Sequence, residues 1–319
     1  MPTKTIALEE AFNVRALQGP EDALLGSINP TWGAYLQERI YDLTDLRIAE
    51  MDSAGIDVQV LSLTSPGIQG MTDTEAAVAT ACEANDLLAG VVAEHPDRFA
   101  GFAALPCQDP AAAVRELERS VRDLGLRGAL INGQTAGVYL DDDAHSGLWE
   151  AAASLGVPIY IHPADPPEPF ACCEGYPLQG ATFGWGFETG THVLRLILAG
   201  VFDRHPSATV VIGHMGELLP FNLVRLDDRY DFYEGAPGIA HPPSWYVRHN
   251  VMITTSGVND EAALQCAIGA LGADRIMFAV DYPYQRNEPA VAFLESAAIS
   301  EVDRELIGHG NAERLLGLG

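Results

Sequence analysis

The chain has 319 residues, 48% of them hydrophobic, and its 44 acidic and 18 basic side chains give a formal net charge of −26. A surface this acidic repels polyanions, which excludes nucleic acid as an expected partner, although a bound cation can still favour a small anionic substrate locally. The sequence lacks the roughly 20 uninterrupted apolar residues of a membrane span and the features of a signal peptide. We expect a cytoplasmic protein that contacts neither nucleic acid nor membrane.

Five cysteines form an odd set without a C-x-x-C pair, which is typical of reduced thiols rather than of a disulfide framework. The adjacent pair at 172 and 173 is open to two interpretations, as metal-binding or redox thiols or as ordinary small side chains in a loop, and we favour the second. The five positions are Cys82, Cys107, Cys172, Cys173 and Cys266.

Short apolar runs alternate with longer helical patterns from end to end, an order typical of βα units and a parallel sheet. Asp109-Pro110 and Asn259-Asp260-Glu261 are typical helix starts within these patterns. An α/β barrel uses about 250 residues or more as one unit, so we expect residues 1–319 to form one (β/α)8 TIM-barrel domain. An open doubly wound sheet shares this order, but no G-x-G-x-x-G follows the first run. The predicted strands are residues 5–8, 58–63, 99–105, 127–131, 157–161, 209–212, 251–255 and 275–279.

Three segments interrupt the alternation. Residues 13–36 are polar with glycine and proline, and residues 163–187 are rich in proline, glycine, cysteine and aromatic side chains. Both directly follow predicted strands, so we expect them as inserted loops at the C-terminal face of the barrel, which carries the active site in this fold. Residues 235–245 form another Pro/Gly loop, but they follow a helix, and we expect them to serve packing or assembly.

Polar side chains stand at or just beyond four predicted strand ends: Glu9, His162, His214 and Asp281. Two imidazoles and two carboxylates that meet at a barrel mouth are suitable ligands for a divalent cation such as zinc or manganese. Taken singly, a buried histidine is more often a hydrogen-bonded core residue, and an aspartate after a strand is often a helix cap. Four such residues at four strand ends favour a metal site.

The local context of these residues sharpens the prediction. Pro163 ends its strand just after the histidine, so the imidazole is presented at the rim. Glycines 213 and 216 permit a tight turn around His214, and we expect Glu217 in the first helical turn, where it can orient that imidazole. A carboxylate beside a metal, as expected of Asp281, can ligate the ion or act as general acid or base.

Several motifs resemble those of the amidohydrolase-related decarboxylases, a group that includes the aminocarboxymuconate-semialdehyde, 2,3-dihydroxybenzoate, γ-resorcylate and 5-carboxyvanillate enzymes. The resemblance covers essentially the whole chain. It rests on residues 7–12 (ALEEAF), 47–57 (RIAEMDSAGID), 161–163 (IHP), 213–217 (GHMGE), 281–283 (DYP) and 310–316 (GNAERLL).

The resemblance implies a metal-dependent, non-oxidative decarboxylase of a hydroxylated aromatic acid such as a hydroxybenzoate. It implies that Glu9, His162 and Asp281 hold the metal and that a carboxylate ortho to a phenol chelates it. Asp281 would then protonate the ring carbon that bears the carboxylate, while His214 with Glu217 orients Asp281 or stabilises charge.

One position departs from a common family pattern, in which a histidine lies two residues after the first glutamate. Here that residue is Ala11, as in the dihydroxybenzoate and carboxyvanillate types. The remaining ligand set is richer in oxygen, which moves the expected ion from zinc toward manganese or magnesium. We expect one divalent ion per chain, manganese or zinc before magnesium.

Further residues have two interpretations each. Arg225 resembles an arginine that in relatives lies at a subunit interface and reaches a neighbouring active site, which predicts a homodimer or homotetramer; the alternative is a surface ion pair with Asp227 or Asp228. An aromatic substrate pocket or simple packing explains Phe183, Trp185 and Phe187 equally well. His192 is interpreted as a packing or supporting residue, and no role is assigned to His95, His145, His205, His241, His249 or His309.

Two other functions remain open. The same barrel can carry a metal-dependent hydrolase of an amide, lactone or ester, or a site that binds a ligand without turnover. A hydrolase often has a lysine that bridges two metals, and residues 132–134 (NGQ) at the expected fourth strand end supply none. The presence of both His214 and Asp281 argues against an inactive barrel.

Overall fold

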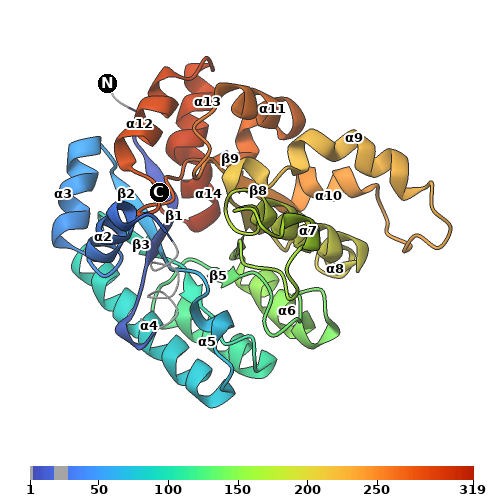
Figure 1. Ribbon diagram of the computed structural model, residues 1–319, viewed down its shortest axis with the longest axis horizontal. Coiled ribbons are helices and arrows are strands. Elements are labelled where there is room, and N and C mark those ends of the chain that lie inside the picture. The colour runs from blue at the N-terminus through green and yellow to red at the C-terminus, as the bar shows by residue number, and fades with distance from the viewer. Residues whose placement is uncertain (1–2, 18–27) are drawn as a thin grey trace.

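The computed structural model describes residues 3–17 and 28–319. Its strands run parallel and in chain order around a barrel (Figure 1). The amide of Phe102 donates to the Leu61 carbonyl at 2.9 Å, which joins the arc β1–β3 to the arc β4–β9, and the amide of Leu8 donates to the Phe278 carbonyl at 3.1 Å, which closes the ring. The strands are β1 (Ile6–Phe12), β2 (Val58–Leu63), β3 (Phe99–Gly101), β4 (Ala103–Ala104), β5 (Ala129–Asn132), β6 (Ile159–His162), β7 (Val210–Ile212), β8 (Val251–Thr254) and β9 (Ile276–Met277).

The predicted eight-stranded barrel is thereby confirmed; most strand ends shift by one or two residues, and two differences are larger. The run predicted as one strand at 99–105 is divided into β3 and β4 on either side of Phe102. The first strand continues past its predicted end at Leu8 as far as Phe12. Glu9, which we expected just after the strand, therefore lies inside it.

Helices surround the strands in the order expected from their sequence punctuation (Figure 1). Asp109 and Asp260 accept backbone N–H bonds at the first turns of α5 and α11, which is the capping role predicted for such residues before a helix. The helices are α2 (Pro30–Arg39), α3 (Asp45–Ala54), α4 (Thr74–Glu94), α5 (Pro110–Arg122), α6 (Ser146–Leu155), α7 (Gly184–Leu198), α8 (Val201–Arg204), α9 (Leu219–Tyr230), α10 (Pro243–Asn250), α11 (Glu261–Leu271), α12 (Asn287–Ser296), α13 (Glu301–Glu305) and α14 (Asn311–Leu316).

By length and composition alone, α4 is apolar enough to cross a membrane. In the fold it is one of the helices around the barrel. Its Asn85 side chain donates to the carbonyl of Ala104 in β4 at 2.9 Å and accepts from the amide of the same residue at 2.8 Å. This pair of bonds fastens the helix to the sheet.

Two apolar layers build the core. Alternate strand residues point into the barrel, because successive side chains of a strand face opposite sides; the opposite faces pack against the helices in a larger cluster. Ala312 and Leu316 of α14 belong to the inner layer. The strand residues of the inner layer are Ile6, Leu8, Val60, Ala100, Phe102, Leu130, Tyr160, Val211, Met252, Met277 and Ala279.

The three interrupting segments differ in structure. Residues 18–27 of the first lie outside the described residues, and its flanks form η1 (Arg15–Leu17) and α2. The second contains η4 (Ala171–Cys173) and ends in the first turn of α7. The third connects α9 to α10 in an arm that projects from the barrel (Figure 1). All five cysteines are free thiols, as predicted.

Replacing Trp149 with alanine should lower the free energy of unfolding by about 3–5 kcal/mol, as is typical for emptying a buried aromatic site. The side chain is 1% exposed, and its indole N–H donates to the Leu140 carbonyl at 2.8 Å. Chemical unfolding followed by circular dichroism measures the change. Trp32→Ala is the control, because that side chain is 40% exposed and should cost about 0.5 kcal/mol or less. A loss below about 1 kcal/mol for Trp149→Ala would contradict the packing role.

Candidate metal and catalytic site

A β-bulge in β1 directs Glu9 into the barrel mouth. Leu8 is paired with Val60 and Glu10 with Leu61, so the register skips Glu9. Glu9 has a φ of 72°, in the left-handed region that costs a non-glycine residue about 1 kcal/mol or more. Bulges of this kind often re-aim a side chain next to an active site.

The two oxygens of the Glu9 carboxylate have different surroundings. Oε2 accepts hydrogen bonds from the hydroxyls of Tyr160 and Ser256 and a longer one, at 3.3 Å, from Thr254. Oε1 is buried and has no hydrogen-bond partner among the described residues. A buried carboxylate oxygen without a donor is expensive, so this atom is suited to receive a cation.

His162 and Asp281 complete a group of three ligand atoms. One atom each from Glu9, His162 and Asp281 lies within 4.8 Å of the others, and His162 Nε2 is 3.5 Å from Glu9 Oε1. The other ring nitrogen, Nδ1, donates to the Pro163 carbonyl at 2.8 Å, which leaves the Nε2 lone pair free. Burial lowers the pKa of His162 and keeps the imidazole neutral, as a metal ligand must be.

This donor set fits a divalent ion. Two carboxylates and one imidazole supply oxygen and nitrogen ligands to manganese or zinc, and the ion would neutralise two acidic groups that otherwise repel each other at close range. Burial raises the pKa of Asp281 to about 6 before any ion is bound, with the neighbouring His214 opposing that rise. Asp281 also has a left-handed φ, 77°, so two of the three ligands hold strained backbone.

His214 stands beside this group and is held by Glu217. Its Nδ1 donates to Glu217 Oε1 at 2.6 Å, and its Nε2 lies 3.8 Å from Asp281 Oδ2 and 3.7 Å from Glu9 Oε1. Burial lowers the pKa of His214, but the surrounding carboxylates outweigh it and hold that pKa well above its usual value. The carboxylates therefore favour the charged form of this partly exposed imidazole, which stands next to Asp281.

The prediction that Glu217 lies in the first turn of a helix is wrong. The chain turns through η5 (His214–Gly216), and Glu217 follows with a φ of 50°, before α9 begins at Leu219. The glycines act differently from one another. Gly216 has a φ of 84°, whereas a Cβ on Gly213 would lie 2.8 Å from Glu9 Oε1; Gly213 is thus required for close approach rather than for the turn.

Sequence reasoning missed the residues that hold Glu9. Tyr160 lies two positions before His162 on the same face of β6, and Ser256 lies two positions after Thr254. The period of two in strands could have identified both, since the same inward face leads to the barrel mouth. Tyr160 and Ser256 can be recognised as hydrogen-bond donors to Glu9 only once Glu9 is known to point between them.

A cavity of about 360 Å³ opens near His162, formed by residues at the ends of β2, β5 and β6 and by the first turn of α7. Of the predicted substrate-binding residues, Trp185 lines it, with its ring centroid 6.3 Å from that of His162 and its N–H donating to Asp165 at 2.6 Å. The lining residues are Ser65, Pro66, Gln69, Gly70, Asn132, Gln134, Ala164, Asp165 and Trp185.

The other predicted substrate-binding residues lie elsewhere. Phe183 is exposed. Phe187 and Arg225 line a second, outward-facing groove between α7 and α9. Asp227 accepts from the amide and hydroxyl of Ser244 and is thus already occupied without Arg225. Within one chain, the described residues therefore place Arg225 on the outside of the barrel.

Glu188 of α7 is a buried carboxylate outside the ligand group. It is 2% exposed, and neither oxygen has a hydrogen-bond partner of good geometry among the described residues. Burial raises its pKa to about 7, against an opposing effect of the Tyr139 hydroxyl, and the charges of Glu217 and Asp165 raise it further. His192, four residues later, accepts from the Leu140 amide at 3.1 Å and packs on Tyr139, which agrees with the expected packing role.

Glu188→Gln should stabilise the protein, and more so at higher pH. The folded-state pKa of about 7 lies above an unfolded value of about 4.3, so ionising the native carboxyl costs stability as pH rises between those values. The gain at pH 8 should exceed the gain at pH 5.5 by about 2 kcal/mol, from 1.36 kcal/mol per pKa unit. Urea unfolding at both values measures it.

The matched control is Glu116→Gln. That carboxyl is also buried, at 5% exposed, but bonds to Arg119 and Asn85 overcome the burial that would raise its pKa and hold it below its usual value. Its replacement should destabilise the protein at pH 8. A gain for Glu188→Gln that is equal at both pH values would show that Glu188 does not titrate in this range.

Three kinds of similarity to known proteins accompany this geometry. Residues 26–318 match the model of a protein family described as amidohydrolase. A γ-resorcylate decarboxylase from Polaromonas sp. is 40% identical over 329 aligned positions, which cover 98% of each chain.

Solved structures agree in fold. A 2,6-dihydroxybenzoate decarboxylase complexed with 2,6-dihydroxybenzoate matches with a TM-score of 0.92 at 37% identity over 99% of both chains. A 5-carboxyvanillate decarboxylase from Novosphingobium aromaticivorans, complexed with manganese and 4-hydroxy-3-methoxy-5-nitrobenzoic acid, matches with a TM-score of 0.94 at 36% identity over 99% of this chain and 96% of that one. The resemblance first drawn from short motifs is confirmed over the full length.

Proposed function

The chain belongs to the amidohydrolase family, and from this premise we propose that it is a metal-dependent, non-oxidative decarboxylase of a hydroxylated aromatic carboxylic acid. The observation that carries the proposal is the group Glu9, His162 and Asp281 with the imidazolium of His214 beside Asp281. The relatives named above support a dihydroxybenzoate with a carboxylate ortho to a phenol as the substrate class.

One divalent ion per chain, held by Glu9, His162 and Asp281, is part of the proposal. Manganese is favoured by the oxygen-rich ligands and by its presence in the 5-carboxyvanillate decarboxylase structure. When bound, the ion supplies Lewis acidity and neutralises the substrate's carboxylate and phenolate charge. Trp185 provides an aromatic wall next to the ligands, suited to a flat ring.

Asp281 is the proton donor in this proposal. Its carboxyl proton passes to the ring carbon that bears the carboxylate; the bond to the carboxylate then breaks, CO2 leaves, and the electron pair of that bond restores the aromatic ring. Asp281 ends as a carboxylate, next to the imidazolium of His214, which stabilises it and can return a proton. Glu217 keeps His214 oriented and charged.

A metal-dependent hydrolase on the same barrel is the weaker alternative. β5 ends at Asn132, and no lysine follows in the Gly133–Gln134 turn to bridge two ions. The relatives named above are decarboxylases. Absence of ester or lactone cleavage by the manganese-loaded protein is the corresponding expectation.

The first test supplies manganese-loaded protein with 2,6-dihydroxybenzoate. We expect equal amounts of resorcinol and CO2, and one manganese per chain by metal analysis. Asp281→Asn should bind manganese and lose turnover by about 10²–10⁴-fold, the usual contribution of a positioned acid, and should fail to exchange deuterium into the product. Asp141→Asn, which removes a partner of Arg195 on the surface, is the control and should stay active. Near-normal turnover of Asp281→Asn would move proton delivery to His214.

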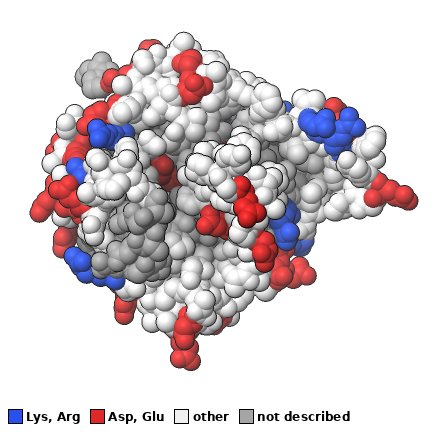
Figure 2. All heavy atoms as spheres, in the orientation of Figure 1, with Lys and Arg blue, Asp and Glu red and all other residues white. Residues whose placement is uncertain are grey.

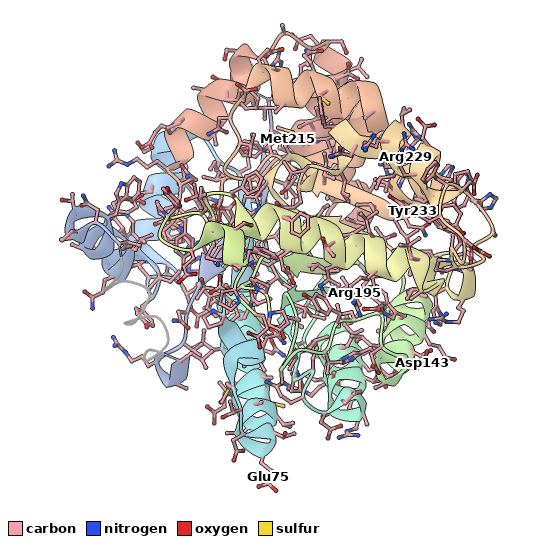
Figure 3. All side chains as sticks on the ribbon, turned by 45° about the vertical axis from the view of Figure 1, so that its right-hand side comes forward. Glu75, Asp143, Arg195, Met215, Arg229 and Tyr233 are labelled. Atoms are coloured by element: carbon pink, nitrogen blue, oxygen red, sulfur yellow. The ribbon has the colours of Figure 1, made fainter. Side chains whose placement is uncertain are left out.

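A homodimer or homotetramer belongs to the proposal as well. The arm of α9 and the segment after it carries exposed apolar side chains, including Phe221 at 84% and Val224 at 71%. Figure 2 shows basic side chains on this arm, and Figure 3 shows Arg229 and Tyr233 on it, apart from Met215 near the barrel centre. A second copy placed on this arm would cover the apolar patch, and Arg225 would then face the neighbour's substrate anion.

Mixing two inactive variants tests whether Arg225 acts across the interface. Arg225→Ala should reduce activity about tenfold or more through the lost charge-assisted contact. Refolded together in equal amounts, Arg225→Ala and Asp281→Asn should regain about a quarter of wild-type activity, because half of the two-fold dimers are mixed and each has one intact site. No recovery in mixtures that light scattering shows to be dimeric, or activity in a strictly monomeric protein, would contradict the shared site.

A further inference from the structure

The backbone amides on both sides of Asp281 donate to a side chain rather than to a neighbouring strand. The Val280 amide donates to Glu10 Oε1 at 2.9 Å and the Tyr282 amide donates to Glu10 Oε2 at 3.1 Å. Glu10 is 0% exposed. Its carboxylate thus spans the residue that supplies the third metal ligand.

The bulge in β1 explains why a side chain is needed here. Backbone bonds from Leu8 to Phe278 and from Ala11 to Tyr282 connect the first and last strands on either side of the bulge. Between these two bonds β1 advances three residues, from Leu8 to Ala11, while the last segment advances four, from Phe278 to Tyr282. The two amides beside Asp281 take the Glu10 carboxylate, rather than a backbone carbonyl, as their acceptor. Glu10, turned away from the barrel interior by the bulge, accepts from both and restores the ladder.

The surroundings of Glu10 are built to hold a carboxylate. Each of its two oxygens accepts a backbone N–H, an arrangement that suits a carboxylate, and the positive charge of Arg47 counters the cost of burial. Arg47 is itself 0% exposed; it donates to the Ala11 carbonyl at 2.7 Å and to Gln59 at 3.2 Å, and its guanidinium lies 4.6 Å from the ring centroid of Tyr282. Arg47 therefore connects Ala11 and Tyr282, which lie close in the chain to the metal ligands Glu9 and Asp281.

We propose that Glu10 is a positioning residue that holds Glu9 and Asp281 in their left-handed conformations and at a fixed separation, and that it thereby sets the affinity of the site for a divalent cation. Glu9 precedes it in the chain, and Asp281 lies between the two amides it binds. The inference rests on the proposed metal site and not on which reaction that site catalyses.

The test measures manganese binding to metal-free full-length protein by electron paramagnetic resonance of the free ion. Glu10→Gln keeps the shape of the side chain, but only one of its two terminal atoms can accept an N–H. We expect the dissociation constant for manganese to rise about 10–100-fold, the usual effect of losing a residue that orients a ligand, and the substrate KM at saturating manganese to change much less than the manganese requirement.

Glu116→Gln is the matched control, since it also removes a buried, multiply bonded carboxylate but lies between α4 and α5. Glu116→Gln should lower the melting temperature. Manganese affinity should stay within about twofold of wild type, because the substitution does not touch the metal ligands. If Glu10→Gln does not fold, Glu10→Asp carries the test, because it keeps the charge and cannot reach both amides.

The outcomes separate the inference from its premise. Weak or absent manganese binding by the wild-type protein would overturn the metal site itself. Wild-type binding with an unchanged constant in Glu10→Gln would overturn only the role of Glu10. Failure of both Glu10 variants to fold at low temperature, while Glu116→Gln folds, would also overturn it, because Glu10 would then be needed for the barrel rather than for the ion.

Discussion

The two oxygens of Glu9 differ in their hydrogen bonding, and the site is arranged around this difference. Three hydroxyl groups from β6, β8 and the residues after β8 surround Oε2, and Oε1 is left without a donor. A carboxylate held in this way cannot rotate to satisfy its second oxygen, so its affinity for a cation is built into the fold. The glycine at 213 is part of the same arrangement, since any side chain there would meet that carboxylate.

Charge within the site is balanced by partners rather than by the surface. The chain carries a net charge of −26, yet the groups that decide the chemistry are buried and respond mainly to neighbours a few ångströms away. His162 is kept neutral by burial, and His214 is kept charged by carboxylates. Two histidines 6.4 Å apart between ring centroids thus have pKa values displaced in opposite directions, one suited to bind an ion and the other to stabilise Asp281.

The strained backbone of the metal ligands is likewise held by neighbouring residues. Glu9 and Asp281 both occupy left-handed backbone, which persists only where surrounding bonds determine it. Hydroxyl groups hold the Glu9 carboxylate. Glu10 accepts from the amides on both sides of Asp281, and Arg47 donates to the Ala11 carbonyl. The arm of α9 is separate from this framework, and its exposed aromatic residues belong to the surface that we propose for assembly.

The sequence by itself determined the order of the strands, the helix starts at Asp109 and Asp260, and the placement of His162, His214 and Asp281 at the barrel mouth, because these follow from local periodicity, capping and strand ends. It did not determine which glutamate enters the barrel. The inward positions Ile6 and Leu8 make Glu10 the next inward residue by a period of two. Glu9 was favoured only by a predicted strand end at Leu8, which the structure moves to Phe12, and by the motif resemblance. The slip of register against β2 reverses the two side chains, and such a slip depends on pairing with a strand 50 residues away.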